Sequence, residues 1–176
     1  IALAGVLGSG GGGPGMAPSY QAVVLPRAAR DSMNAIFSRF NQHWNELQDV
    51  NTLTQMLGTG KPTQREYLGC LEGAVSTDTL WIRRLAPARG LRQLQFAVTG
   101  DCGHVKHLVG TWHTHPYRAS PDNLPLKEPA LSTQDLATFA ASSDLVSLVV
   151  WDVDSLDAAI KNEGGQVIHP GMVIVR

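Results

Sequence analysis

Residues 107–116 read HLVGTWHTHP, an apolar run that ends in two histidines one residue apart. Such a run predicts a β-strand, and residues i and i+2 of a strand point to the same face, about 7 Å apart. His113 and His115 therefore project together at the end of the strand, where Pro116 turns the chain into a loop. Two imidazoles placed in this way favour a metal site, although a lone H-x-H pair is equally typical of two half-exposed histidines on an edge strand.

The segments around this strand predict a mixed sheet with helices on it, an α/β (α+β) fold. Strands are expected at 20–26, 65–75, 79–88, 92–100 and 145–153, with closing strands near the C-terminus. A long amphipathic helix is expected from the helical spacing of Ala29, Met33, Ile36, Phe37, Phe40, Trp44 and Leu47, and a second helix opens in 132–143. Residues 51–63 are expected to form a short helix or loop, and a short helical or polar piece begins at 156. A proline-rich loop spans 116–131, and loops of this kind usually shape access to a site.

Composition limits the function classes. The chain has 176 residues, 43% of them hydrophobic, which suits one domain with a real core. A net charge of −1 does not favour a nucleic-acid partner or an anionic membrane surface. No apolar run approaches the roughly 20 residues that span a bilayer. Two cysteines, Cys70 and Cys102, are too few for a disulfide framework and fit a reducing cytoplasm, with a single disulfide left open.

The first fifteen residues differ in composition from the rest. IALAGVLG is a short apolar octamer, and SGGGGPG after it is a flexible linker. Met16 then has the character of a natural start. We therefore expect residues 1–15 to be an appended peptide and linker, and residues 16–176 to form the domain.

A third metal ligand is available where the loop returns. Ser132-Thr133-Gln134-Asp135 opens the second helix, and Asp135 offers a carboxylate oxygen. Two imidazoles and one carboxylate leave an open position on a tetrahedral zinc, as in catalytic rather than structural sites. The same four residues also fit a capping box, an ordinary helix start, and both interpretations hold together.

Hydrolysis at such a site needs a base for the attacking water. Glu66, at the beginning of the predicted 65–75 strand, is the candidate, and Glu72 is its competitor. An acidic residue that opens a strand is more often simply solvated. A thiol nucleophile at Cys102, next to Gly103 and His104, is the weaker alternative because no orienting third residue stands out.

These pieces together resemble the JAMM signature of the JAB/MPN-domain metalloproteases. The matching residues are E-x-x-G-x-x-x-G at 66–73, H-T-H-P at 113–116 and S-T-Q-D at 132–135, in the family's order. The resemblance covers roughly residues 20–176. It implies a single MPN domain with a curved sheet flanked by helices. It also implies Zn²⁺ held by His113, His115 and Asp135, with Glu66 as general base and Ser132 as oxyanion donor.

The resemblance further implies a function. The family hydrolyses a peptide or isopeptide bond after the C-terminal glycine of ubiquitin or a ubiquitin-like protein. The chain's small size is similar to the prokaryotic JAB branch, which accompanies bacterial ubiquitin-like conjugation and antiviral operons such as CBASS. Alternatives left open are a metal-free MPN interaction scaffold, a processing peptidase for sulfur-carrier proteins, and a nuclease-related role. IALAGVLG itself is either an appended remnant or a mimic of a glycine-terminated substrate tail, added to the groove as a strand.

Overall fold

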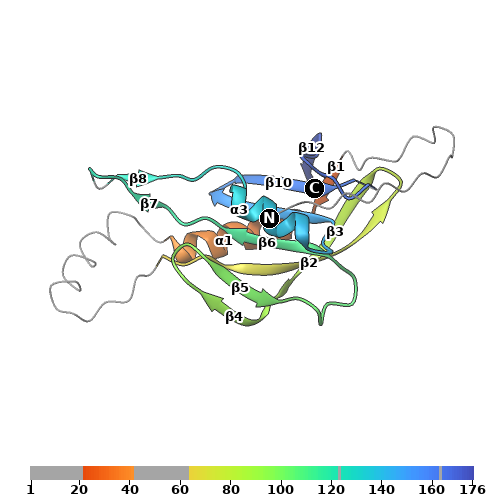
Figure 1. Ribbon diagram of the computed structural model, residues 1–176, viewed down its shortest axis with the longest axis horizontal. Coiled ribbons are helices and arrows are strands. Elements are labelled where there is room, and N and C mark those ends of the chain that lie inside the picture. The colour runs from red at the N-terminus through yellow and green to blue at the C-terminus, as the bar shows by residue number, and fades with distance from the viewer. Residues whose placement is uncertain (1–21, 42–63, 123, 163) are drawn as a thin grey trace, which may run out of the picture.

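The computed structural model describes residues 22–41, 64–122, 124–162 and 164–176 (Figure 1). Residues 1–15, the 51–63 segment, and the predicted helical extension to Trp44 and Leu47 lie outside the described residues. The domain boundary predicted at Met16 lies outside them as well. Among the residues described, no helix is both long and apolar enough to cross a membrane.

The body of the molecule is one eight-stranded sheet in the order β11-β10-β9-β6-β2-β3-β1-β12. The bounds are β1 Ala22–Leu25, β2 Leu68–Ser76, β3 Thr79–Pro87, β6 Leu108–Thr114, β9 Val146–Asp152, β10 Ser155–Lys161, β11 Val167–Ile168 and β12 Met172–Val175. The sheet is mixed: β1 pairs in parallel with β3 and β12, and β6 with β9, whereas the other neighbours are antiparallel. The fold is therefore α+β with mostly β content, as expected from the alternating and apolar runs.

Helix α1, Arg27–Phe40, packs on one face of the sheet. Pro26 precedes its first turn, where a missing N–H costs nothing. Ala29, Met33 and Phe37 recur every four residues and are buried, because this spacing places them on one side of a helix. They join Leu148 and Trp112 in the larger hydrophobic core.

Helix α3, Thr133–Ala141, covers the opposite face (Figure 1). Its buried Phe139 packs in a second, smaller cluster with Val149 of β9 and Ala159 of β10. Since side chains alternate along a strand, β9 sends Val146, Leu148 and Val150 toward α1 and Val149 toward α3. The chain from β6 through α3 to the parallel β9 thus forms one β-α-β crossover that carries the candidate site.

Two predicted elements are wrong. The 92–100 strand is instead the turn and second arm of a hairpin, β4 Arg89–Gln93 with β5 Val98–Asp101, closed by a hydrogen bond from Leu94 N–H to the Ala97 carbonyl at 2.8 Å. The piece at 156 is not helical but forms β10, antiparallel to β9. Its sequence, LDAAIK, suits a helix by propensity, and pairing with a buried neighbour overrides that preference.

The 116–131 loop is also more ordered than its prolines suggest. It contains a short hairpin, β7 Arg118–Ala119 with β8 Pro125–Leu126, which projects at the left of Figure 1. Tyr117 and Lys127 both bond the Asp152 carboxylate at the end of β9. The loop is therefore tied to the sheet at both of its arms.

Cys70 of β2 and Cys102, which directly follows β5, form a disulfide across 32 residues. The bond joins the small β4–β5 sheet to the main sheet. Disulfides are typical of oxidising compartments, so this one weighs against the predicted cytoplasmic location. The location of the protein stays a prediction. It also leaves Cys102 without a thiol, which removes the thiol-nucleophile alternative.

Candidate metal centre

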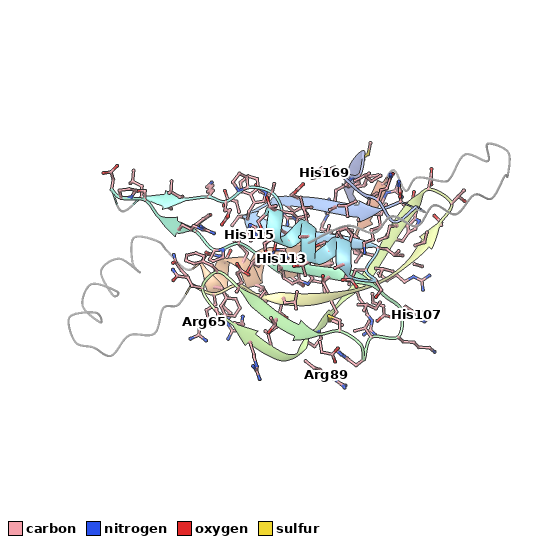
Figure 2. The ribbon with its side chains drawn as sticks, in the orientation of Figure 1. Arg65, Arg89, His107, His113, His115 and His169 are labelled. Atoms are coloured by element: carbon pink, nitrogen blue, oxygen red, sulfur yellow. A yellow bond between two sulfur atoms is a disulfide. The ribbon has the colours of Figure 1, made fainter. Side chains whose placement is uncertain are left out.

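His113 and His115 stand together at the end of β6, as the strand periodicity predicts. Their side chains lie side by side near the middle of the molecule, whereas His107 and His169 lie elsewhere (Figure 2). Both are buried, at 7% and 5% exposed, and their Nε2 atoms are 3.2 Å apart. The alternative of two half-exposed edge histidines is therefore wrong: β6 is a central strand between β2 and β9.

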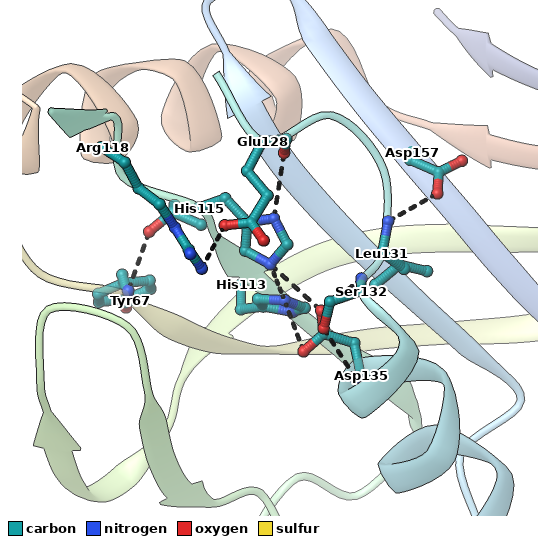
Figure 3. A network of polar contacts seen from close by, with 10 residues as sticks. Tyr67, His113, His115, Arg118, Glu128, Leu131, Ser132, Asp135 and Asp157 are labelled. Carbon is teal, nitrogen blue, oxygen red and sulfur yellow. Dashed lines mark hydrogen bonds and ion pairs between the residues drawn. The ribbon is translucent and has the colours of Figure 1, made fainter. Parts of the chain in front are cut away.

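Asp135 reaches the same point from the first turn of α3. Its Oδ1 lies 3.3 Å from His113 Nε2, and its Oδ2 lies 3.2 Å from His115 Nε2 (Figure 3). Ser132 is the N-cap, and the capping box is complete: Ser132 Oγ accepts from Asp135 N–H at 3.1 Å, and Asp135 Oδ2 accepts from Ser132 N–H at 2.8 Å. The candidate ligand Asp135 is thus also a member of the capping box.

The donor atoms lie close enough together to hold one metal ion. One ligand atom from each of the three residues lies within 4.8 Å of the others. The two Nε2 atoms are 3.2 Å apart, and Asp135 directs Oδ1 toward His113 and Oδ2 toward His115. His113, His115 and Asp135 are therefore compatible with a bound metal, and two imidazoles with one carboxylate form a donor set that zinc accepts.

Hydrogen bonds hold the groups of this site in place. His115 Nδ1 lies 3.2 Å from the Glu128 carbonyl, which only accepts, so Nδ1 carries a proton and Nε2 faces the triad. Burial acts to lower the pKa of His115, but its hydrogen bonds with Asp135 and with the Glu128 carbonyl raise that pKa overall. Burial alone would raise the pKa of Asp135, but hydrogen bonds from His113 and His115 outweigh burial and hold that pKa well below its usual range. The carboxylate is ionised and available as a ligand.

Glu66 lines the same cavity as the triad, a cavity of about 500 Å³. Its backbone is held at the β4–β5 turn: Glu66 N–H donates to the Leu94 carbonyl at 3.0 Å, and the Glu66 carbonyl accepts from Gln93 Nε2 at 2.9 Å. Burial raises the pKa of Glu66 to about 7, an effect that His115 opposes and Asp135 reinforces. A carboxyl with a pKa near neutrality suits a general base.

The competitor Glu72 is placed differently. It lies further along β2, pairs with Arg84 at 2.6 Å, and is not among the residues that line the cavity. Of the two carboxylates, only Glu66 shares a cavity with His113 and His115, so the geometry favours Glu66.

Ser132 also lines the cavity. Because its Oγ accepts from Asp135 N–H, its own hydroxyl proton is free to donate toward the cavity. The structure therefore gathers all five residues singled out in the sequence, Glu66, His113, His115, Ser132 and Asp135, at one place.

Further residues of the cavity carried no signal in the sequence. Arg118 pairs with Glu128 at 2.7 Å and lies over the Phe96 ring at 4.6 Å, which closes one wall between the β7–β8 loop and the β4–β5 turn. Thr111, Ser147 and Asp144 line its far end. The pairing of Arg118 with Glu128 depends on a loop conformation that no spacing rule predicts.

No protein-family model matches this chain. No curated protein matches it either. The interpretation of the site therefore depends on the residues and their geometry.

Proposed function

We propose that this chain is a zinc-dependent peptidase or isopeptidase of the JAB/MPN type, and that its α+β sheet with α1 and α3 is an MPN domain. One observation carries the proposal: two imidazoles and a carboxylate close enough together to bind one metal ion share a cavity with a carboxyl whose pKa is near neutrality. A structural zinc site would fill its fourth position with protein and would not need such a carboxyl.

His113, His115 and Asp135 would hold the ion. Bound there, zinc would polarise a carbonyl group and lower the pKa of a coordinated water toward about 7. Glu66 would accept a proton from the attacking water and return it to the leaving amine. Ser132, with its free hydroxyl proton, would donate to the oxygen on which negative charge develops. The Glu128 carbonyl would keep the His115 ring in one orientation throughout.

The proposed substrate is an extended tail that ends in glycine, carried by a ubiquitin-like or conjugated protein. Four consecutive residues of the β4–β5 hairpin, Phe96, Ala97, Val98 and Thr99, line the cavity. Consecutive lining is expected where a strand offers its backbone edge, because side chains alone would alternate. An extended chain can add to such an edge as a further strand, and a tail without a Cβ next to the cleaved bond fits closest to the triad.

The test combines metal content with cleavage. We expect about one zinc per chain by elemental mass spectrometry, lost in His115→Ala and Asp135→Ala and retained in Glu66→Gln. The zinc-loaded protein should cleave a glycine-terminated ubiquitin-like fusion at the glycine, and Glu66→Gln should not. Retention of zinc by both ligand variants, or full turnover by Glu66→Gln, would contradict the proposal. A protein that binds zinc but cleaves none of the fusions would contradict the peptidase assignment alone.

A further inference from the structure

The cavity extends from the triad to a polar end beneath α3, at the residues Thr111, Asp144 and Ser147. Thr111 and Ser147 are registered partners on the parallel strands β6 and β9. They lie on the sheet face that α3 covers, where β9 places Val149 and where a packed layer normally carries apolar side chains. Polar groups at this position therefore need a reason other than packing.

Two polar atoms at this end have no partner within the described part of the chain. Ser147 lines the cavity and is only 5% exposed as a residue, and no described residue hydrogen-bonds its hydroxyl, which is itself not fully buried. Asp144 Oδ2 accepts from Thr111 Oγ1 at 3.2 Å, whereas Oδ1 receives no hydrogen bond from those residues. Both residues line the cavity, so a hydroxyl and a carboxylate oxygen remain available to a bound group.

The charge at this end is negative. Asp144 has no ion-pair partner at contact distance among the residues described. The positive charge of Lys161 on β10 acts on Asp144 from further away, while its ammonium group donates a hydrogen bond to the Ser142 carbonyl. Elsewhere the cavity carries the carboxylates of Glu66, Glu128 and Asp135, and its one arginine, Arg118, pairs with Glu128. Burial raises the pKa of Asp144, which is the cost that a bound cation would relieve.

Strand geometry fixes the distance of this end from the chemistry. Thr111 and His113 are two residues apart on β6, so they share a face and lie about 7 Å apart. An extended substrate repeats its own side-chain direction at the same interval. A substrate that runs along β6 with its cleaved carbonyl at the triad would place the side chain two residues away above Thr111 and Asp144.

We propose that Asp144, with Thr111 and Ser147, forms a subsite for a protonated amine or guanidinium group, the lysine or arginine side chain two residues from the cleaved bond. The inference rests on the proposed function for the identity of that bond. Asp144 supplies the charge, and Ser147 supplies an additional acceptor. Asp144 and Ser147 here are specificity-determining residues and take no part in the proton transfers.

Binding without turnover tests the subsite separately from the peptidase. The probes are short capped peptides with a central Gly-Gly and otherwise alanine, carrying one lysine at each position in turn, and matched peptides with uncharged norleucine. Binding is measured by titration calorimetry to zinc-loaded Glu66→Gln. When the lysine lies two places from the central Gly-Gly bond, we expect its peptide to bind about tenfold tighter than the matched norleucine peptide. At every other position the two peptides should bind equally.

Variants locate the effect. Asp144→Asn, which is isosteric and still accepts from Thr111, should abolish the lysine preference when added to Glu66→Gln, and Ser147→Ala should reduce it. Asp122→Asn, on the exposed 116–131 loop, is the matched control and should leave it intact. Equal binding of all pairs, no binding by any peptide, or a preference that survives Asp144→Asn would overturn the subsite. An Asp144-dependent preference without cleavage by the wild type would support the subsite and sink the peptidase.

Discussion

His115 uses its two ring nitrogens for different tasks. Nδ1 is engaged by the Glu128 carbonyl at 3.2 Å, and Nε2 faces Asp135 and His113. The histidines and the aspartate were predictable, because strand periodicity and helix capping fix local directions over a few residues. The Glu128 carbonyl was not predictable, since it depends on the path of a loop thirteen residues away in sequence.

At Glu66, removal of the carboxylate should separate metal binding from catalysis. Glu66→Gln keeps the size of the side chain but accepts no proton, so turnover should fall by about 10²–10⁴-fold while zinc content is unchanged. Steady-state kinetics on metal-quantified protein measures both. Glu72→Gln is the matched control, and a loss of turnover there equal to that of Glu66→Gln would refute the assignment of the base.

The raised pKa of Glu66 predicts a pH-dependent stability. The folded pKa is about 7 and the reference value 4.5, so between these pH values the folded state holds a proton that the unfolded state releases. Stability from this group is therefore lost as pH rises from 4.5 to about 7. In zinc-free protein, Glu66→Gln should raise Tm relative to wild type more at pH 8 than at pH 5, measured by calorimetry; an equal difference at both pH values would rule out the shift.

At the scale of elements, most of the strands and the helix that carry the candidate metal ligands could be predicted from the sequence. The hairpins that form the walls of the cavity could not. β2, β3, β6, β9 and α3 appear where apolar runs, alternation and the capping box indicate them. The β4–β5 hairpin was missed because LQFA joins two arms without glycine or proline to mark the turn. β10 was missed because burial on both sides removes the alternation that identifies a strand.

The 116–131 loop should behave as a support for the metal centre. Tyr117 and Lys127 both bond Asp152, which keeps the neighbouring Glu128 carbonyl at His115. Asp152→Ala should therefore weaken zinc binding by about 10–100-fold without removing any ligand. Competition with a chromophoric chelator measures this affinity. Asp122→Asn, exposed on the same loop, should have no effect, and an unchanged affinity in Asp152→Ala would mean that the loop does not support the site.

At the scale of the whole molecule, the layers explain why the site lies where it does. α1 and α3 cover opposite faces of the sheet, and β6, the strand that carries the histidines, is central. The triad therefore rests on buried, well-packed elements, whereas Arg118, Glu128 and Phe96 come from hairpins at the periphery. Catalytic sites commonly hold their reactive residues on rigid elements and form their cavity walls from peripheral loops, and this site has the same arrangement.

The disulfide should stabilise this whole arrangement. Closing a loop of 32 residues stabilises the fold by about 3–4 kcal/mol in the chain-entropy model. Reduction of the zinc-free protein with a phosphine should then lower Tm by about 7–15 °C. The double variant Cys70→Ala/Cys102→Ala should already melt at the lower temperature and ignore the reductant. A wild-type Tm that is indifferent to the reductant would contradict a stabilising bond.

The crossover from β6 to β9 has a consequence for how such proteins diversify. The histidines are fixed by the sheet and Asp135 by a helix cap. The segment between them, residues 116–131, is held at its ends by hydrogen bonds to Asn41, Asp152 and Asp157 and by the Glu128 carbonyl at His115. A loop of another length could therefore replace this segment if it kept these contacts. The replacement would present different residues to a different substrate, while the proposed metal ligands and Glu66 would keep their positions. A new loop grafted between Tyr117 and Lys127 would be the first change to make in redirecting the protein to a chosen substrate.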